Sequence, residues 1–293
     1  MADHGNTRSA SACVFALVGI LLMACVLRSA AVALRSENLS IDRDSYLAIA
    51  QNLVNGNGYC SVAGQPTAFR PPLYPLLVAG CLRLGGVSIV GVVQILLGTG
   101  TVWLTWLLAR QCRLSQRTGL IAAALVAVDP LLIEYSTQAM TETLFTFLVA
   151  LLLAVTLHTD RTDRKKLNSV LVGTVFGLTA LCRPSIWAFG GLAALGWGFQ
   201  QIQHHRKNRR SLVPVELASF VSAGLCVAAV VLVVSPWVIR NTRQFSHPIV
   251  MTTHGGYTLL LGNNETFFQQ VVAGKPGATW TEASLKAWQA ENK

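Results

Sequence analysis

The chain has 293 residues, of which 52% are hydrophobic and only 12% are charged, and its net charge is +10. A soluble domain carries about 25% charged residues, so this composition excludes an ordinary soluble protein. The charge does not indicate a nucleic-acid partner either, because the basic residues lie in short loops between long apolar stretches, as in the cytoplasmic loops of membrane proteins.

The apolar residues form blocks that approach the roughly 20 residues needed to cross a bilayer. Inside lipid each backbone amide needs a partner within its own segment, so such blocks predict helices. We therefore expect an all-α fold, a polytopic transmembrane helix bundle of the inner membrane with about seven spanning helices. These helices are expected at residues 12–34, 87–109, 119–132, 143–157, 170–181, 186–199 and 217–234.

The first apolar stretch contains Arg28. We expect Arg28 to extend towards the outer interface, as long cationic side chains do; the alternative is that it faces a polar cavity in the bundle. Residues 31–33 also match a signal-peptide cleavage site. Because the apolar stretch is long and the segment before it carries little positive charge, we favour an uncleaved helix over a signal peptide.

A polar outer loop is expected at about residues 35–72. Within it, apolar side chains recur at helical spacing from Tyr46 to Leu53, which predicts a short amphipathic helix lying in the membrane interface. Gly56 and Gly58 are expected to end this helix.

Three clusters of basic residues fall between the later helices, and all lie on one side under this topology, which predicts that this side is cytoplasmic. Their members are Arg110, Arg113 and Arg117, then Arg161, Arg164, Lys165 and Lys166, then Arg206, Lys207, Arg209 and Arg210. Residues 1–235 are thus expected to form the transmembrane domain. Residues 236–293 are polar and are interpreted as the incomplete start of an extracytoplasmic region.

Two carboxylates precede the interfacial helix. Asp44 occupies the position expected for its N-cap, which favours Asp42 as a general base that accepts a proton from a hydroxyl. The choice between Asp42 and Asp44 stays open, since both side chains could simply be solvated.

Further ionisable residues gather on the same predicted face. Arg70 lies in a proline-rich run, where a guanidinium suits phosphate oxygens or a lipid headgroup. Glu142 either joins a site or stabilises the N-terminus of its helix, and Arg183 and Arg240 follow the outer ends of two helices. The histidines and cysteines lack metal-ligand spacing, so no metal site is predicted, and dependence on a divalent metal stays open.

Several motifs occur in a specific order. They are Asp42 to Ala50 with its Asp-x-x-x-Tyr pattern, Asn55 to Tyr59, Phe69 to Pro75, Ala139 to Phe145, Gly177 to Pro184, Pro236 to Asn241 and Gly262 to Asn264. Together they resemble the GT-C membrane glycosyltransferases, most closely the group of protein O-mannosyltransferases, the aminoarabinose transferase of lipid A and the lipopolysaccharide-core galacturonosyltransferases. The resemblance covers about residues 42–264.

The resemblance implies an inverting glycosyltransferase that moves a sugar from a polyprenyl-phosphate donor to an acceptor hydroxyl of a lipid, glycan or protein on the non-cytoplasmic face. Arg70 and Arg183 stand where the aminoarabinose transferases have lysines, and Glu142 stands where they have an aspartate. The implied site comprises the acids Asp42 and Asp44, the donor-phosphate ligands Arg70, Arg183 and Arg240, and the further polar residues Glu142, Tyr46 and Tyr74.

Two alternatives remain at the level of sequence. A transporter or flippase of lipid-linked sugars would place its ionisable residues near the bilayer midplane. The chain is also shorter than members of the resembled group usually are, so it is interpreted as a fragment or truncated form, and an inactive homologue that only binds polyprenyl phosphate is the second alternative.

Overall fold

The computed structural model describes residues 4–159, 164–207, 215–275, 277–279 and 282–291. These residues are mostly helical, and they divide into two units. The first unit comprises residues 1–67 and 71–251, and the second comprises residues 68–70 and 252–293. The predicted helical class is therefore correct for most of the described chain.

The first unit contains ten α-helices, one 3-10 turn and two strands among its described residues. In chain order these are α1 (His4–Leu34), η1 (Ser36–Ser40), α2 (Tyr46–Val54), β1 (Cys60–Val62), β2 (Gln65–Pro66), α3 (Leu73–Gly85), α4 (Val87–Gln111), α5 (Gln116–Val128), α6 (Pro130–Tyr135), α7 (Glu142–Thr159), α8 (Lys165–Cys182), α9 (Ile186–Lys207) and α10 (Val215–Phe245). The second unit contains α11 (His254–Gly262), α12 (Glu265–Phe267), the π-helical turn η2 (Phe268–Val272) and α13 (Glu282–Glu291).

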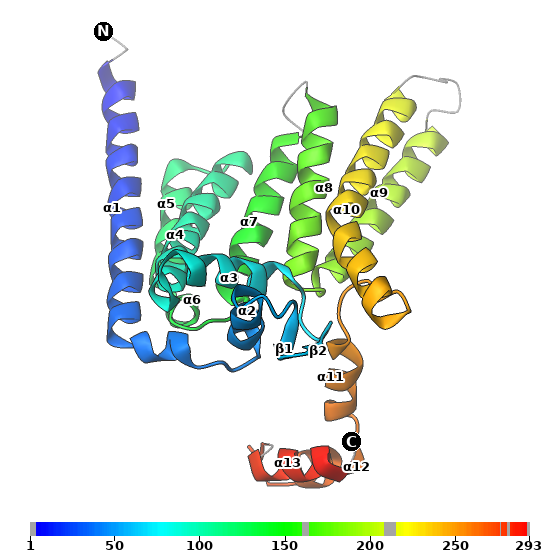
Figure 1. Ribbon diagram of the computed structural model, residues 1–293. Helices are drawn as coiled ribbons and strands as arrows, with labels where there is room; N and C mark the ends of the chain where they lie inside the picture. Colours follow the sequence, from blue (N-terminus) through cyan, green and yellow to red (C-terminus); the bar gives the residue numbers. More distant parts are fainter. Residues whose placement is uncertain (1–3, 160–163, 208–214, 276, 280–281, 292–293) are drawn as a thin grey trace. The chain divides into compact units, whose positions relative to one another are not determined.

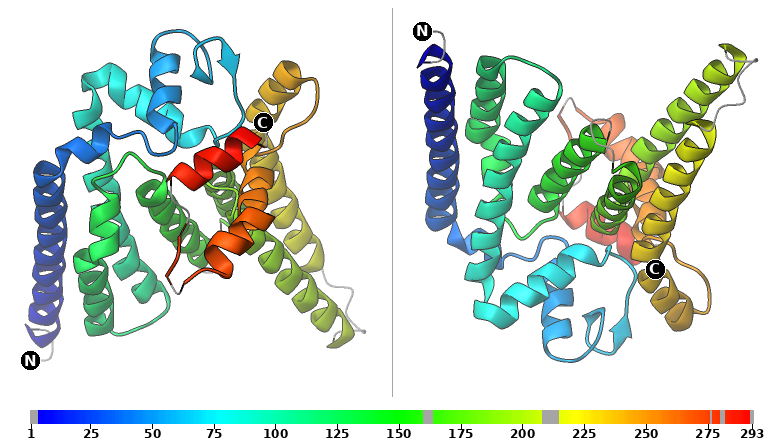
Figure 2. Two further views of the ribbon diagram at one scale, coloured as in Figure 1. Left: turned by 90° about the horizontal axis from the view of Figure 1, so that it is seen from below. Right: turned by 90° about the horizontal axis from the view of Figure 1, so that it is seen from above.

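The long helices of the first unit stand side by side (Figure 1). Helix α1 packs against α4 and α5, α4 packs against α7, α7 against α8, and α8 against α9 and α10. Figure 2 shows the same succession from two further directions. The turn from α4 to α5 and the start of α8 lie at one end of the unit, and α2 and the two strands lie at the other (Figure 1).

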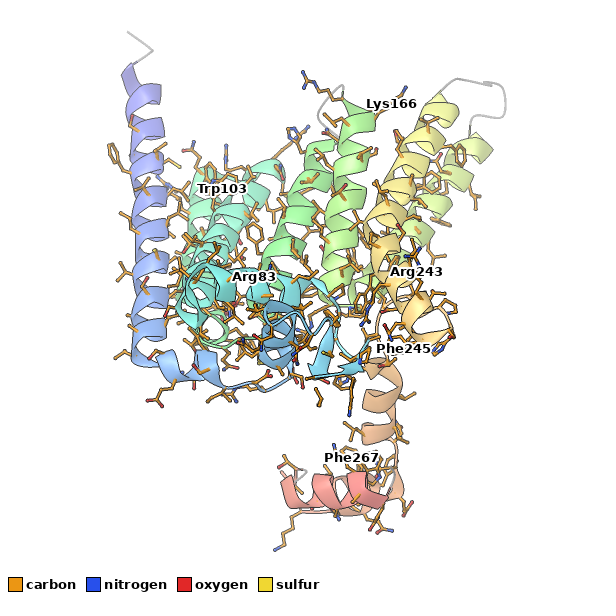
Figure 3. All side chains as sticks on the ribbon, in the orientation of Figure 1. Arg83, Trp103, Lys166, Arg243, Phe245 and Phe267 are labelled. Atoms are coloured by element: carbon orange, nitrogen blue, oxygen red, sulfur yellow. The ribbon has the colours of Figure 1, made fainter. Side chains whose placement is uncertain are left out.

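The basic clusters, as far as the structure describes them, lie at the end of the first unit that holds the turn from α4 to α5 (Figure 1). Lys166 lies at the first end, whereas Arg243 lies towards the other end of the unit (Figure 3). Arg161, Arg209 and Arg210 lie outside the described residues. The arrangement agrees with basic loops on one side of a membrane and residues 35–66 on the other.

Three helical segments among the described residues are long and apolar enough to cross a membrane: Ser11–Leu34, Val87–Gln111 and Phe220–Phe245. Three other apolar helices are shorter, at Leu73–Gly85, Gln116–Val128 and Glu142–His158. At 1.5 Å per residue, α5 is only about 20 Å long, less than the roughly 30 Å of a hydrocarbon core. The chain is thus a multi-helix membrane protein, but the predicted count of about seven spans is not confirmed.

Helix α5 ends at Val128, earlier than the predicted Leu132, because Asp129 and Pro130 start a new helix. The Asp129 carboxylate accepts a hydrogen bond from the amide of Leu132 at 2.9 Å and caps α6. Pro130 occupies the first helical position, where a missing N–H has no helical partner to lose.

Arg28 of α1 is buried beside this break, with only 1% of its surface exposed. Its Nη1 donates to the carbonyl of Ala127 at 3.1 Å, and its Nη2 donates to that of Val126 at 3.3 Å. These carbonyls belong to the last turn of α5, which lacks helical donors. The expectation that Arg28 extends to the interface is therefore wrong, because the broken helix offers it acceptors inside the protein.

Glycine is required where Arg28 crosses α4. A Cβ atom added to Gly98 would lie 2.5 Å from Nε of Arg28, closer than any ordinary contact. The absence of a side chain at this position leaves the space that the guanidinium occupies.

Helix α10 continues to Phe245, past the predicted end at residue 234, although it contains Pro236. Proline removes the amide that would bond the carbonyl four residues earlier, which is that of Leu232. The hydroxyl of Ser235 donates to this carbonyl at 3.2 Å. A neighbouring side chain thus replaces the missing donor, and the helix can pass through the proline.

Close packing of α8 on α10 depends on two glycines one turn apart. A Cβ atom at Gly173 would lie 2.2 Å from the carbonyl oxygen of Cys226, and one at Gly177 would lie 2.9 Å from Val233. Small residues at this spacing allow helix backbones to approach in membrane proteins.

The predicted outer loop contains the expected helix and also an unpredicted hairpin. Helix α2 forms over Tyr46–Val54, and Gly56 and Gly58 follow it with positive φ of 80° and 79°. Strand β1 then pairs antiparallel with β2, with Cys60 opposite Pro66. The hairpin was missed because its strands are three and two residues long, too short for a periodic pattern.

Candidate active site

Asp42 is held at the start of α2 by two backbone amides. Its Oδ1 accepts from the amide of Leu47 at 3.2 Å, and its Oδ2 accepts from that of Ala48 at 2.8 Å. The N-cap residue is Ser45, with a left-handed φ of 63°. The prediction that Asp44 is the N-cap is therefore wrong, because the tight turn at Ser45 brings Asp42 back over the first turn of the helix.

The Asp42 carboxylate also lines a pocket of about 370 Å³. The pocket wall is mostly apolar, and it is formed by Ser40, Asp42, Leu47, Ala48, Gln51, Leu82 and Val87. Among these described lining residues there is one carboxylate and no cationic side chain. Since each carboxylate oxygen has two lone pairs, Asp42 can accept a further hydrogen bond from a group in the pocket.

Tyr46 and Tyr74 meet in the core next to α2. Their rings are 5.2 Å apart in an edge-to-face arrangement, and their exposed fractions are 4% and 1%. Burial, with smaller contributions from Cys182, Tyr46 and Glu142, raises the pKa of the Tyr74 phenol well above its usual value. Tyr74 therefore keeps its proton at neutral pH.

Glu142 and Arg183 form an ion pair across 41 positions of sequence, with Oε1 of Glu142 3.1 Å from Nη1 of Arg183. Glu142 is the first residue of α7, where the helix dipole favours a negative charge. Arg183 follows α8 and also lies over the ring of Phe145, with its guanidinium carbon 5.6 Å from the ring centre.

The two members of this pair differ in exposure. The side chain of Arg183 is 42% exposed, whereas that of Glu142 is 16% exposed. The second carboxylate oxygen of Glu142, Oε2, is buried without a hydrogen-bond partner among the described residues. Arg183 has five N–H groups, so it can pair with Glu142 and still present donors at the surface.

The guanidinium of Arg240 donates hydrogen bonds to backbone carbonyls of the protein. Its Nη1 donates to the carbonyl of Thr67 at 2.7 Å, and its Nη2 donates to that of Tyr59 at 2.9 Å. The guanidinium carbon also lies 5.3 Å from the ring centres of Tyr59 and Trp237. These contacts fasten the β1–β2 hairpin to α10, so they favour a structural role over phosphate binding.

Arg70 belongs to the second unit. Its guanidinium carbon lies 4.8 Å from the ring centre of Phe69. The ring of Phe69 in turn meets that of His254 at 4.5 Å, and the amide of Thr253 donates to the carbonyl of Ala68 at 3.1 Å. Asp42 belongs to the first unit, so the expectation that Arg70 and Asp42 serve one site stays a prediction.

A family model described as dolichyl-phosphate-mannose-protein mannosyltransferase matches residues 69–240. The chain belongs to this family. It thus carries a GT-C glycosyltransferase domain, as the sequence motifs predicted. No curated protein and no solved structure matches the chain.

The matched range includes five of the predicted site residues of this mannosyltransferase family member, namely Arg70, Tyr74, Glu142, Arg183 and Arg240. Asp42, Asp44 and Tyr46 precede it. The structure brings Glu142 to Arg183 and Tyr46 to Tyr74, and it places Asp42 at a pocket.

One residue beside this site was missed by the sequence reasoning. Gln94 of α4 is 1% exposed and donates hydrogen bonds to the phenol of Tyr74 and to the carbonyl of Gln138. Its signal was present, because an amide side chain within an otherwise apolar membrane helix usually has a specific partner.

Proposed function

We propose that the chain is an inverting glycosyltransferase that moves a sugar from a polyprenyl-phosphate donor to an acceptor hydroxyl on the non-cytoplasmic face of the inner membrane. Membership of the mannosyltransferase family supports sugar transfer, and the family description names a dolichyl-phosphate sugar. The observation that carries the assignment within this chain is the Asp42 carboxylate, fixed by two amides at a pocket.

In this proposal the pocket receives the acceptor rather than the phosphate of the donor. A phosphate would be repelled by the carboxylate of Asp42, because the described lining residues offer it no cation. A neutral hydroxyl can instead donate its proton to Asp42, which acts as general base. Gln51 and Ser40 can hold other hydroxyls, and Leu82 and Val87 suit the apolar face of a sugar ring or lipid.

The donor phosphate is assigned to the exposed guanidinium of Arg183. Arg70, in the second unit, stays a ligand predicted from the sequence alone. As the acceptor oxygen bonds to the anomeric carbon, the bond from that carbon to the phosphate oxygen breaks and negative charge grows on the leaving lipid phosphate. A fixed cation in a low-dielectric setting stabilises this charge. One displacement inverts the anomeric centre, and the acceptor proton passes to Asp42.

Replacing Asp42 by Asn should abolish transfer while the protein still inserts into the membrane. The amide keeps the size of the side chain but loses the basic oxygen, and loss of a general base costs about 10²–10⁴-fold in rate. The measurement is transfer of radiolabel from a polyprenyl-phosphate sugar in purified membranes that contain the variant at the wild-type level. Asp44→Asn tests the other candidate acid and should retain activity, and Glu37→Gln, at an exposed carboxylate outside the proposed site, is the matched control.

The same assay separates the alternatives. Wild-type turnover by Asp42→Asn would remove Asp42 from the reaction. Movement of the labelled lipid across the bilayer without transfer would indicate a flippase, and binding without either would indicate an inactive homologue.

A further inference from the structure

Gln94 is positioned to hold the segment that delivers Glu142. This segment, the 136–141 turn, connects α6 to α7 and ends directly before Glu142. Four of its residues are almost completely buried, with exposed fractions of 0–2%: Ser136, Thr137, Ala139 and Thr141. Nε2 of Gln94 donates to the carbonyl of Gln138 in the middle of the turn.

Apart from a long contact at 4.0 Å between the thiol of Cys182 in α8 and the carbonyl of Thr141, the remaining bonds of the turn are local. The Thr137 hydroxyl donates to the carbonyl of Glu134 at 2.8 Å, Nε2 of Gln138 donates to Oε1 of Glu134 at 3.1 Å, and the amide of Met140 donates to the carbonyl of Gln138 at 2.8 Å. Such bonds shape the turn but do not fix its place against the bundle. The bond from Gln94 does, because it comes from α4, 44 positions away.

The same amide group reaches the helix that carries Asp42. Nε2 of Gln94 also donates to the phenol oxygen of Tyr74 at 3.4 Å, and the ring of Tyr74 meets that of Tyr46, the first residue of α2. Gln94 is thereby connected to both parts of the proposed site. It reaches the helix that holds Asp42 through Tyr74 and Tyr46, and it reaches the Glu142–Arg183 ion pair through the 136–141 turn.

We propose that Gln94 is a positioning residue that sets the 136–141 turn so that Glu142 meets Arg183, and that it keeps this turn in register with α2 through Tyr74. The catalytic consequence rests on the proposed function, whereas the placement of the turn does not. Nothing in this role requires Gln94 to touch the substrate.

The placement can be tested without any activity assay, because Cys182 reports on the turn. The thiol of Cys182 is 1% exposed and lies 4.0 Å from the carbonyl oxygen of Thr141. The variant Gln94→Met keeps the length of the side chain and removes its donor. It also removes the amide oxygen, which has no partner among the described residues, so the fold should tolerate the change.

We expect Cys182 in Gln94→Met to react with N-ethylmaleimide about tenfold faster than in the wild type, since the loosened turn opens locally. Site-resolved mass spectrometry measures the rate, and Cys13 of α1, 9% exposed, reports any global opening. Gln111→Leu is the matched control, because Gln111 donates from the opposite end of α4 to the carbonyl of Ala154 in α7 at 3.1 Å. It should leave the Cys182 rate unchanged.

Unchanged labelling of Cys182 in Gln94→Met, or equal acceleration in Gln111→Leu, would overturn the proposal. If Gln94→Met does not accumulate, Tyr74→Phe provides the second variant. It leaves the bond from Gln94 to the turn intact, so Cys182 should stay protected while transfer slows through α2.

Enzyme kinetics then test the catalytic part. Gln94→Met should lower kcat with little effect on the KM of the donor in the wild-type background, and it should have no further effect on kcat in Glu142→Gln. Additive losses in the double variant would contradict action through Glu142. Should the wild type show no transfer at all, the proposed function fails, while the labelling result still decides the role of Gln94.

Discussion

At the scale of single residues, the sequence predicted the side chains of the site one by one, but it did not predict which of them contact one another. Glu142 and Arg183 were both identified, yet their ion pair depends on how α7 and α8 pack, which no local pattern encodes. Asp42 was chosen because Asp44 was expected to cap α2, and the structure reverses that argument. The left-handed conformation of Ser45 determines that Asp42 contacts the first turn of α2, and serine rarely adopts this conformation, so the sequence did not predict it.

Arg183→Ala should destabilise the protein, because it leaves the largely buried carboxylate of Glu142 without its cation. Arg183 is 42% exposed, so solvent screening limits the coupling to about 0.5–1 kcal/mol. The measurement is a double-mutant cycle of thermal unfolding in detergent with Glu142→Gln. Additive effects of the two substitutions would mean that the pair contributes nothing to stability.

At the scale of elements, hydrophobic blocks located most helices, but their ends followed from local chemistry. Helix α5 stops at Asp129 because an N-cap and a proline start α6, while α10 passes Pro236 because Ser235 satisfies the freed carbonyl. Pro130 starts a new helix, whereas Pro236 lies within a continuous one. The difference comes from the preceding side chains, Asp129 and Ser235. The strands of the β1–β2 hairpin are too short for a periodic sequence pattern to predict them.

Gly173→Val should separate α8 from α10, because the new side chain would collide with the backbone of Cys226. Overpacking of this kind typically costs about 1–3 kcal/mol, and a collision with backbone falls at the upper end. The expected result is a lower thermal unfolding midpoint in detergent.

Gly191→Val in α9 is the control for Gly173→Val, since an added Cβ there would meet no atom within 4 Å. An equal loss in both variants would attribute the effect to glycine replacement in general rather than to the α8–α10 contact.

At the scale of the whole molecule, composition and the placement of basic residues were sufficient to predict a helical membrane protein. The number of crossings was not predictable with the same certainty, because α5 and α7 are apolar but shorter than the three helices that qualify by length and composition. The motifs predicted the family, which the match over residues 69–240 shows.

The two ends of the first unit should be accessible from opposite sides of the membrane. Cys112, which is exposed between α4 and α5 beside the basic residues, should react with an impermeant maleimide only after cells are permeabilised. A cysteine introduced as Gln65→Cys in the exposed β2 strand should react in intact cells. Labelling of both positions from the same side would refute the proposed orientation and, with it, an outward-facing Asp42.

The contact between Arg28 and the end of α5 has a consequence for assembly. A helix that breaks within the bundle would otherwise leave its last carbonyls in need of water. Here a side chain from α1 supplies the donors, and Gly98 of α4 provides the room. The end of α5 therefore depends on α1 and α4, and because both are synthesised before α5, the donor for the carbonyls of Val126 and Ala127 precedes them along the chain.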